Sequence, residues 1–269
     1  MFRQRLVTAA VLVSLAVAGV LLLTPGQLAL LFAAVTLVAA WEWTQLANLV
    51  SPALRVGYVA LTGVLLVVVL YLPLAGVLWL AAAWWLVAVV WIGSYGMGRA
   101  DSPPWVRAVA GILVLVPAWR ALVAVRDVEQ HGQYYLLFLL ALIWAADTAA
   151  YFVGRRWGRF SLAPRVSPGK TWEGVWGALA SGLVLSMTMA ALMGMAPRSW
   201  FGFALLGGFT VVVSIVGDLL ESVCKRASGV KDSGQLLPGH GGVLDRLDSL
   251  TAAAPVFMLG LSWLELTSL

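Results

Sequence analysis

Long apolar stretches separated by short polar connections follow one another along the whole chain. A helix rises about 1.5 Å per residue and the hydrocarbon core of a bilayer is about 30 Å thick, so about 20 apolar residues span it. Nine stretches approach this length, at residues 5–23, 27–48, 54–72, 74–95, 106–125, 134–154, 173–196, 199–222 and 243–268. They predict an all-α, polytopic membrane protein with about nine transmembrane helices. A signal peptide behind Arg3 and Arg5 is the alternative for the first stretch, but the second stretch follows after only about three residues.

The composition indicates that lipid is the main solvent of this chain. Hydrophobic residues make up 62% of the 269 positions and charged residues 11%, whereas soluble domains carry about 25% charged residues. No repeat or low-complexity linker divides the chain. We therefore expect one integral-membrane domain, 1–269, in which residues 1–125 form a helical scaffold and residues 134–269 carry the catalytic helices and loops.

The few cysteine and histidine residues limit the metal chemistry. Cys224 has no partner for a disulfide, and His131 and His240 are too few for a zinc site of the usual His-rich kind. Any metal must therefore be held by carboxylates, which suits a hard ion such as magnesium.

Basic residues lie mostly on one side of the predicted bundle. If the N-terminus is cytoplasmic and nine spans alternate, fourteen Lys and Arg residues are cytoplasmic, and two, Arg126 and Arg198, lie on the opposite side. This distribution follows the positive-inside rule. Topology thereby explains the net charge of +5, and we expect no nucleic-acid partner.

Four aspartates occupy predicted spans or their ends, namely Asp147, Asp218, Asp245 and Asp248. A charged side chain at the centre of a bilayer costs about 2.5–3.5 kcal/mol on insertion scales, so each needs a cavity, a partner or a metal. All four fall toward the predicted cytoplasmic ends of the sixth, eighth and ninth spans. We therefore predict that they converge on one water-accessible site that holds a divalent cation.

Helical spacing places further polar groups beside these aspartates, because residues three, four and seven apart share a helix face. Two such sets are Asp218, Glu221, Ser222 and Lys225 on the eighth span, and Asp245, Asp248 and Ser249 on the ninth. The alternative is that Asp218 pairs with Lys225 or Arg246 and only locks the bundle. Glu42, in the second span, is expected to be the buried partner of a cation.

Two predicted cytoplasmic loops, at residues 154–174 and 224–242, are rich in glycine and basic residues. Glycine lets backbone N–H groups approach a ligand closely, and Lys and Arg neutralise phosphate charge. In the first loop, Lys170 and Thr171 are expected to form an anion pocket with the start of the seventh span. A P-loop nucleotide site is excluded, because Pro164 stands where that motif needs a glycine and no strand precedes it.

The same residues resemble the signature of one enzyme family. The pattern is Ser222-x-x-Lys225-Arg226-x4-Lys231-Asp232-x-Gly234-x2-Leu237-Pro238-Gly239-His240-Gly241-Gly242-Val243-x-Asp245-Arg246-Leu247-Asp248, preceded by Ser167-Pro168-x-Lys170-Thr171-x-Glu173-Gly174 and by Gly217-Asp218. Over about the last 125 residues, the chain closely resembles the phosphatidate cytidylyltransferases, also called CDP-diacylglycerol synthases. Cys224 departs from the pattern, since the family tends to carry an aliphatic residue there.

The resemblance implies that CTP and phosphatidate react to give CDP-diacylglycerol and pyrophosphate, with Mg²⁺ as cofactor. It also implies a protein of the bacterial cytoplasmic membrane, whose site faces the cytoplasm and takes phosphatidate from the inner leaflet. A second, monovalent cation and assembly as a homodimer are left open.

On this basis the candidate residues take three roles. The expected metal ligands are Asp147, Asp218, Asp245 and Asp248, with Asp248 either a ligand or an orienting residue. The expected catalytic residues are Lys225, Arg226, Lys231, Asp232 and Arg246, and the basic ones among them are expected to clamp phosphates. The expected substrate-binding residues are Ser167, Lys170, Thr171, Glu173, Ser222, Gly239, His240, Gly241 and Gly242. For His240, a role confined to its own turn is an equal alternative.

Two other functions are compatible with parts of the pattern. A CTP-dependent polyprenol or phytol kinase would pass the γ-phosphate to an alcohol and release CDP, but the fuller motif in this chain argues against it. A secondary transporter also carries intramembrane carboxylates, but its halves should be pseudo-symmetric. Here the charged residues crowd one end of the chain.

Overall fold

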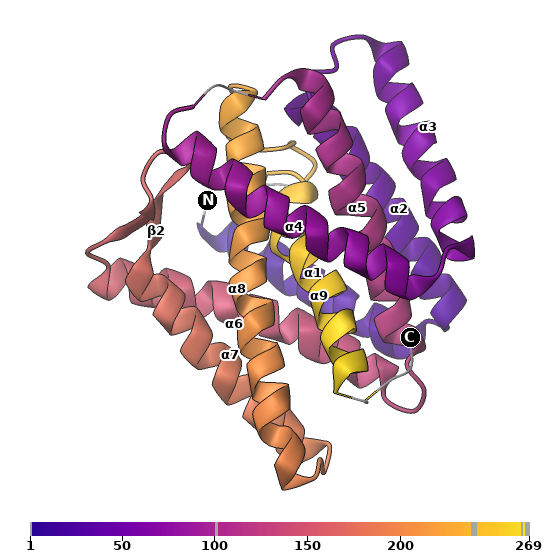
Figure 1. Ribbon diagram of the computed structural model, residues 1–269, viewed down its shortest axis with the longest axis vertical. Helices are drawn as coiled ribbons and strands as arrows, with labels where there is room; N and C mark the ends of the chain where they lie inside the picture. The colour runs from indigo at the N-terminus through magenta and orange to yellow at the C-terminus, as the bar shows by residue number, and fades with distance from the viewer. Residues whose placement is uncertain (1, 100–101, 238–240, 265, 267–269) are drawn as a thin grey trace.

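The computed structural model describes residues 2–99, 102–237, 241–264 and 266 (Figure 1). Nine α-helices of these residues occupy the nine predicted stretches. Their bounds are α1 Phe2–Leu22, α2 Pro25–Leu46, α3 Pro52–Val68, α4 Leu74–Gly96, α5 Pro104–Asp127, α6 Gly132–Trp157, α7 Trp172–Leu192, α8 Pro197–Ala227 and α9 Asp248–Trp263. The shorter elements are the 3₁₀ helices η1 Val69–Tyr71 and η2 Leu244–Arg246, and the strands β1 Ser161–Ala163 and β2 Ser167–Thr171.

Seven helices are long and apolar enough to cross a membrane, namely α2, α3 with η1, and α4 to α8. The apolar part of α1, Ala10–Leu22, is shorter, and α9 has 16 residues. The prediction of an all-α polytopic membrane protein is confirmed. The count of nine spans stays a prediction.

Local sequence signals set several of the helix starts. Four helices begin with a proline, at a position where the missing N–H would have had no helical partner; these are Pro25, Pro52, Pro104 and Pro197. In front of α2, Thr24 and Gln27 form a capping box. The helices therefore begin close to where the apolar stretches do.

The helix α9 lies in the centre of the bundle, which explains how a short helix can be apolar on all sides. It packs against α4, α5, α6 and α8, and its residues from Ser249 to Leu259 are all buried. Phe257 of α9 stacks on Phe138 of α6 with ring centroids 5.7 Å apart, and Phe138 stacks on Phe203 of α8 at 5.1 Å. This packing fixes the place of Asp248, the first residue of α9.

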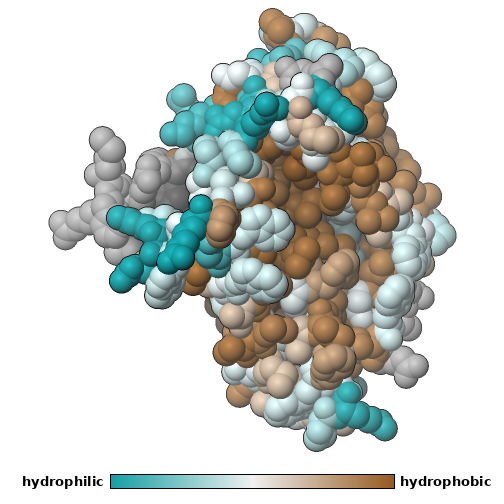
Figure 2. Space-filling model, turned by 60° about the vertical axis from the view of Figure 1, so that its left-hand side comes forward, coloured by the Kyte–Doolittle hydropathy of each residue, from teal (hydrophilic) through white to brown (hydrophobic). Residues whose placement is uncertain are grey.

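The outward faces of the bundle are apolar, as expected for helices in contact with lipid. Figure 2 shows hydrophobic side chains over the middle of one face and hydrophilic ones gathered toward its ends. Large apolar side chains are exposed on α3, α4 and α7, for example Leu61, Val64, Leu86, Val90 and Val184. Soluble monomers rarely expose apolar patches of this extent.

The last helix starts later than the sequence predicted. The prediction that residue 243 opens a helix with Asp245 and Asp248 on one face is wrong, because Asp245 lies on η2, before α9 begins. Glu42 and Asp245 accept hydrogen bonds from the main-chain N–H groups of residues 242–244. Side-chain bonds of this kind compete with helical hydrogen bonding and favour a turn.

The loop between α6 and α7 folds into a β-hairpin that the sequence did not predict. The strands β1 and β2 pair antiparallel, with Ser161 opposite Thr171, and they stand at the left edge of the bundle in Figure 1. Val166, between the strands, is buried against Leu219 and Val223 of α8. The hairpin is therefore anchored to α8 beside its polar face.

Candidate active site

The hairpin brings Lys170 to the carboxylate of Asp218 on α8. The Lys170 ammonium and Asp218 Oδ2 form an ion pair, and the two side chains are 26% and 28% exposed. Ser222, one turn further along α8, donates a hydrogen bond to Asp218 Oδ1 at 3.4 Å. Asp218 thus pairs with Lys170 and not with Lys225. Partly exposed pairs are worth little free energy, so Lys170 can exchange this carboxylate for a phosphate.

Thr171 and Glu173 hold the hairpin to the start of α7. Thr171 is the N-cap of α7, and its hydroxyl accepts the N–H of Gly174 at 3.2 Å. Glu173 Oε2 accepts the N–H of Phe160 at 3.4 Å. Ser167 opens β2 and is partly exposed. These contacts fix the position of the hairpin, and substrate binding by these residues stays a prediction.

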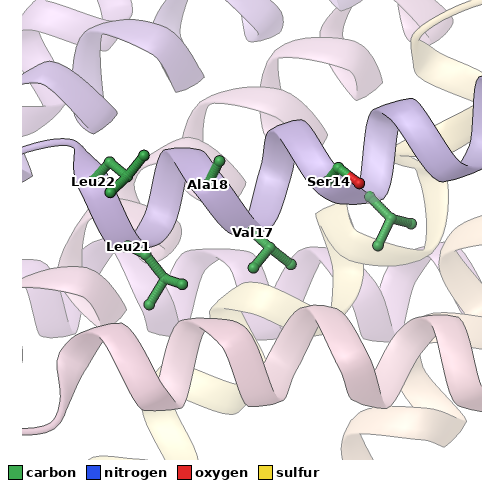
Figure 3. Close-up of a pocket in the computed structure, with 6 residues that line it drawn as sticks. Ser14, Val17, Ala18, Leu21 and Leu22 are labelled. Carbon is green, nitrogen blue, oxygen red and sulfur yellow. The ribbon is translucent and has the colours of Figure 1, made fainter.

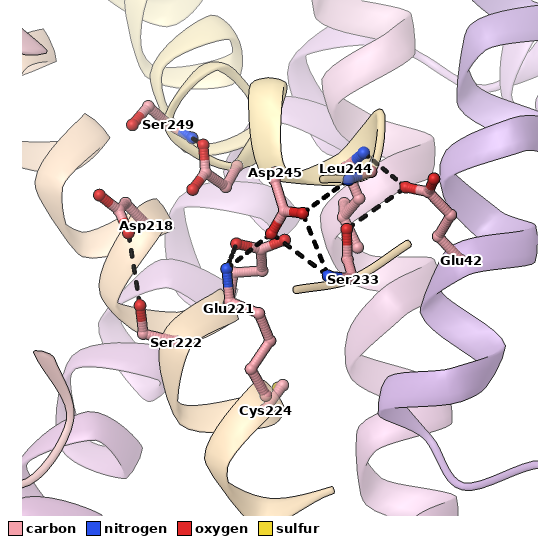
Figure 4. A network of polar contacts seen from close by, with 12 residues as sticks. Glu42, Asp218, Glu221, Ser222, Cys224, Ser233, Leu244, Asp245 and Ser249 are labelled. Atoms are coloured by element: carbon pink, nitrogen blue, oxygen red, sulfur yellow. Dashed lines mark hydrogen bonds and ion pairs between the residues drawn. The ribbon is translucent and has the colours of Figure 1, made fainter. Parts of the chain in front are cut away.

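Lys225 lies between two buried carboxylates, Glu221 and Asp245, which Figure 4 labels, and forms the centre of a charged network. Its Nζ lies 2.5 Å from Glu221 Oε2 and 2.8 Å from Asp245 Oδ1. The side chains of Glu221, Asp245 and Lys225 are 2%, 8% and 13% exposed. Charge-assisted bonds between buried groups are strong, and the loss of one partner is costly. The network therefore joins α8 firmly to η2.

Asp245 is held by main-chain N–H groups as well as by Lys225. The N–H of Ser233 donates to both its oxygens, at 3.3 and 3.1 Å, and the N–H of Gly242 donates to Oδ2 at 2.8 Å. Burial acts to raise the pKa of Asp245, but the bonds from Lys225 and the two N–H groups outweigh burial and lower the pKa below its usual value. Asp245 is therefore ionised at neutral pH, with both oxygens engaged.

The other acidic residues lie close enough to act on one another electrostatically. Asp218 acts on Asp147 of α6, and Asp218 and Glu221 act on Asp248. The cations that act on this group are Lys170, Lys225 and Arg246. The side chain of Asp147 is exposed. Carboxylates thus outnumber cations in this cluster, and a divalent cation would favour their ionised forms.

The acidic cluster fits a magnesium ion that completes its shell with water and phosphate. Among the described residues, no group of three or more Asp, Glu, His or Cys side chains is placed so that it could hold a metal ion. Mg²⁺, however, needs only one or two protein carboxylates beside waters and substrate phosphates. Glu221 Oε1 is buried and has no hydrogen-bond partner in the described part of the chain, which is costly for a carboxylate oxygen. The carboxylates are of the chemical kind that Mg²⁺ takes as ligands, and both the metal and its individual ligands stay a prediction.

The glycine-rich segment before η2 is described only in part. Gly241 has a φ of +81°, a conformation that L side chains rarely adopt. Gly242 donates its N–H to Asp245. Gly239 and His240 lie outside the described residues, so their substrate contacts stay predictions.

Three predicted basic residues lie apart from the buried network. Lys231 and Asp232 line a polar hollow of about 310 Å³ beside α2. Arg226 is exposed, and its Nε lies 3.5 Å from a carbonyl oxygen of the hairpin. Arg246 is exposed on η2 and acts electrostatically on Asp147. These exposed side chains are accessible to a ligand without rearrangement of the bundle.

A larger hollow along α1 holds no candidate chemistry (Figure 3). Its volume is about 470 Å³, and it is lined by Val13, Ser14, Val17, Ala18, Leu21 and Leu22. Ser14 is the only polar side chain among these six. A charged phosphate would find no partner in such a lining.

Glu42 and Ser233 belong to the network; the sequence singled out Glu42 as a buried carboxylate but gave no sign of Ser233. Glu42 accepts hydrogen bonds from the N–H groups of Val243 and Leu244 and from the hydroxyl of Ser233. Within the described ranges, N–H and O–H dipoles and not the predicted cation are the partners of Glu42. A lone acidic residue in an apolar span does signal a buried site. It does not reveal which distant segment supplies the partners.

Fold and site together define an integral membrane protein whose buried acidic and basic groups suit the handling of phosphates. A family model for the cytidylyltransferase family matches residues 3–264, and the chain belongs to this family. A phosphatidate cytidylyltransferase of Pseudomonas aeruginosa is 47% identical over 262 residues, which cover 96% of each chain. One of Haemophilus influenzae is 39% identical over 280 residues, covering 96% of this chain and 97% of the relative. One of Bacillus subtilis is 41% identical over 141 residues, 52% of each chain.

Proposed function

We propose that this enzyme transfers the cytidylyl group of CTP to phosphatidate, giving CDP-diacylglycerol and pyrophosphate. The observation that carries the proposal is the cluster of carboxylates and cations that joins α6, α8, η2 and the hairpin. It occurs in a chain 47% identical, over almost its whole length, to a relative named for this activity. Such a cluster suits a reaction between two phosphates, which repel each other until cations neutralise them.

The reaction needs no serine or cysteine nucleophile, because the phosphate of phosphatidate is already an oxyanion. One of its oxygens forms a bond to the α-phosphorus of CTP, while the bond from that phosphorus to the bridging oxygen of the β-phosphate breaks. Pyrophosphate leaves with the electron pair, and no proton is transferred. The task of the protein is to hold both anions in line and to stabilise the charge that develops.

Lys170 is the cation best placed to bind a phosphate, since its ion pair with Asp218 is partly open. The guanidinium of Arg246, which is exposed on η2, is a second candidate. Lys225 forms ion pairs with Glu221 and Asp245. We therefore propose that it holds these carboxylates in place and does not itself contact the phosphates. The two groups that contact substrate thus come from the hairpin and from η2.

Asp218 and Asp248 are the carboxylates that we propose as the principal metal ligands, with Asp147 and Asp245 beside them. Asp218 is the common neighbour, because it acts electrostatically on both Asp147 and Asp248. When bound, Mg²⁺ would neutralise phosphate charge and polarise the α-phosphate. Asp218 and Asp248 come from different helices, so the packing of α8 on α9 sets their separation.

The site is proposed to face the cytoplasm of a bacterial cell, where CTP is found. Both α6 and α8 carry basic residues in their last turns, namely Arg155, Arg156, Lys225 and Arg226. By the positive-inside rule these helix ends are cytoplasmic. Phosphatidate would then reach the acidic cluster sideways from the inner leaflet, with its acyl chains still in lipid.

Position-labelled CTP separates this reaction from its rivals. The purified protein is reconstituted in vesicles containing phosphatidate and supplied with Mg²⁺ and CTP radiolabelled at the α- or the γ-phosphorus. The proposal predicts label in the lipid from α-labelled CTP, and labelled pyrophosphate from γ-labelled CTP. Label from the γ-position in the lipid, with release of CDP, would identify a kinase. Substrate flux across the vesicle without CTP turnover would identify a transporter.

A further inference from the structure

Glu42 is a buried carboxylate of α2 that binds the segment carrying Asp245. Its side chain is 4% exposed. Oε1 accepts the N–H of Val243 at 3.0 Å, and Oε2 accepts the N–H of Leu244 at 2.8 Å and the hydroxyl of Ser233 at 3.3 Å. Hydrogen bonds to an ionised acceptor are stronger than neutral ones. Glu42 therefore ties η2 and the preceding loop to α2 (Figure 4).

Glu42 and Asp245 hold the same segment from two sides. The hydroxyl of Ser233 donates to Glu42, whereas the N–H of Ser233 donates to Asp245. The consecutive N–H groups of residues 242–244 are likewise divided between the two carboxylates. Asp245 in turn binds Lys225 of α8. A continuous polar path thus leads from Glu42 to the charged residues of the proposed site.

Two glycines make room for the Glu42 carboxylate. A Cβ at Gly234 would lie 2.7 Å from Glu42 Cδ and 3.1 Å from its Cγ, and a Cβ at Gly242 would lie 2.7 Å from the same Cδ. Neither glycine has a positive φ, so space, not backbone conformation, requires glycine at both positions. The loop is therefore shaped around this one carboxylate.

We propose that Glu42 is a positioning residue of the reaction, which sets the place of Asp245 and Arg246 by binding the main chain of η2. The inference rests on the proposed function, and it extends the site to α2, in the part of the chain expected to be scaffold. Glu42 contacts no reacting group and acts through the η2 turn.

Glu42→Gln keeps the size of the side chain but turns one acceptor oxygen into an NH₂ group that faces main-chain donors. We expect kcat for pyrophosphate release to fall about 10- to 100-fold, as for other residues that orient the groups in direct contact with the ligand. Thr44→Val, on the same helix, is the matched control. It removes a buried hydroxyl that donates only to the carbonyl oxygen of Trp41, at 2.6 Å, and should leave kcat unchanged.

Hydrogen–deuterium exchange separates positioning from general loss of stability. In Glu42→Gln we expect faster exchange at the amides of residues 233 and 242–245, while α9 stays as protected as in the wild type. Faster exchange throughout the bundle would show a merely structural role and overturn the proposal. A wild-type kcat despite faster local exchange would overturn it as well.

Gly234→Ala tests the same contact with Glu42 intact. The added methyl must displace the Glu42 carboxylate, so kcat should fall by a similar factor. In a Glu42→Ala background that space is free, and the same alanine should cost no more than about twofold further. If the loss of kcat in the double variant equals the product of the losses in the two single variants, the proposal is contradicted. A wild-type protein inactive with CTP and phosphatidate would instead refute the proposed function, and the exchange measurement would still test the contact.

Discussion

Replacing Lys225 with methionine keeps an unbranched side chain, one heavy atom shorter, but removes the charge from between two buried carboxylates. Glu221 Oε2 then loses its hydrogen-bond donor, and Glu221 Oε1 already has none within the described chain. Asp245, in contrast, keeps the N–H groups of Ser233 and Gly242. The cost of Lys225→Met therefore falls mainly on Glu221, which is 2% exposed.

The expected loss of stability is large. Removing one partner of a buried ion pair costs about 3–5 kcal/mol. In a chain of this size each kcal/mol shifts the thermal midpoint by about 2–4 °C, so Lys225→Met should lower the midpoint by roughly 6–20 °C. The assay is thermal unfolding of the purified protein in detergent, followed by tryptophan fluorescence, with the wild type measured in parallel.

A second substitution shows which of the two carboxylates causes the loss of stability in Lys225→Met. Adding Glu221→Gln to Lys225→Met removes the uncompensated charge and should restore more than half of the lost midpoint. Adding Asp245→Asn should restore little of it, because Asp245 retains main-chain donors. A Lys225→Met midpoint within about 2 °C of the wild type, or equal rescue by both second substitutions, would refute the reasoning.

Three further predictions concern other parts of the site. Gly217→Ala should destabilise the protein by about 1–3 kcal/mol and lower pyrophosphate release, because the added Cβ would lie 2.5 Å from the carbonyl oxygen of Asp248. Gly208→Ala, on the same helix, is the control. Its added Cβ would lie 3.5 Å from the nearest atom, so stability and pyrophosphate release should both stay unchanged. Because the pKa of Asp245 is lowered, its stabilising effect is complete above its unfolded pKa of about 3.9 and is lost as pH falls through the lower folded value. In metal-free buffer the midpoint difference between wild type and Asp245→Asn should therefore shrink as the pH falls below about pH 4; a difference that stays the same or grows there would contradict this. Lys170→Ala should raise the KM for CTP about tenfold while shifting stability by less than about 1 kcal/mol, and an unchanged KM would remove Lys170 from the phosphate site.

The helices could be predicted from the sequence because their signals are local. Each apolar stretch is long enough to fix its own helix, and prolines mark several of the starts. The approach of Lys170 to Asp218 was also predictable, since alternating spans bring the loops of one side together. The family followed from the motif spacing, and the full-length match confirmed it.

The pairing of charges could not be predicted, because it depends on contacts between distant segments. Glu42 and Ser233 are 191 positions apart in the sequence, and no local pattern links them. The start of α9 was misplaced for the same reason, since a carboxylate from α2 takes up N–H groups of η2. The hairpin was missed because its stability comes from Val166 packing on α8, not from an alternating strand pattern.

Pyrophosphate release by the Asp218→Asn variant is the most direct test of the acidic cluster as the reaction centre. Asparagine keeps the shape of the side chain and removes the charge shared with Lys170 and the neighbouring carboxylates. In vesicles with CTP, phosphatidate and Mg²⁺, the rate should fall at least about 100-fold, with a thermal midpoint close to that of the wild type. Release at the wild-type rate would contradict the assignment of Asp218 to the metal and of the cluster to catalysis.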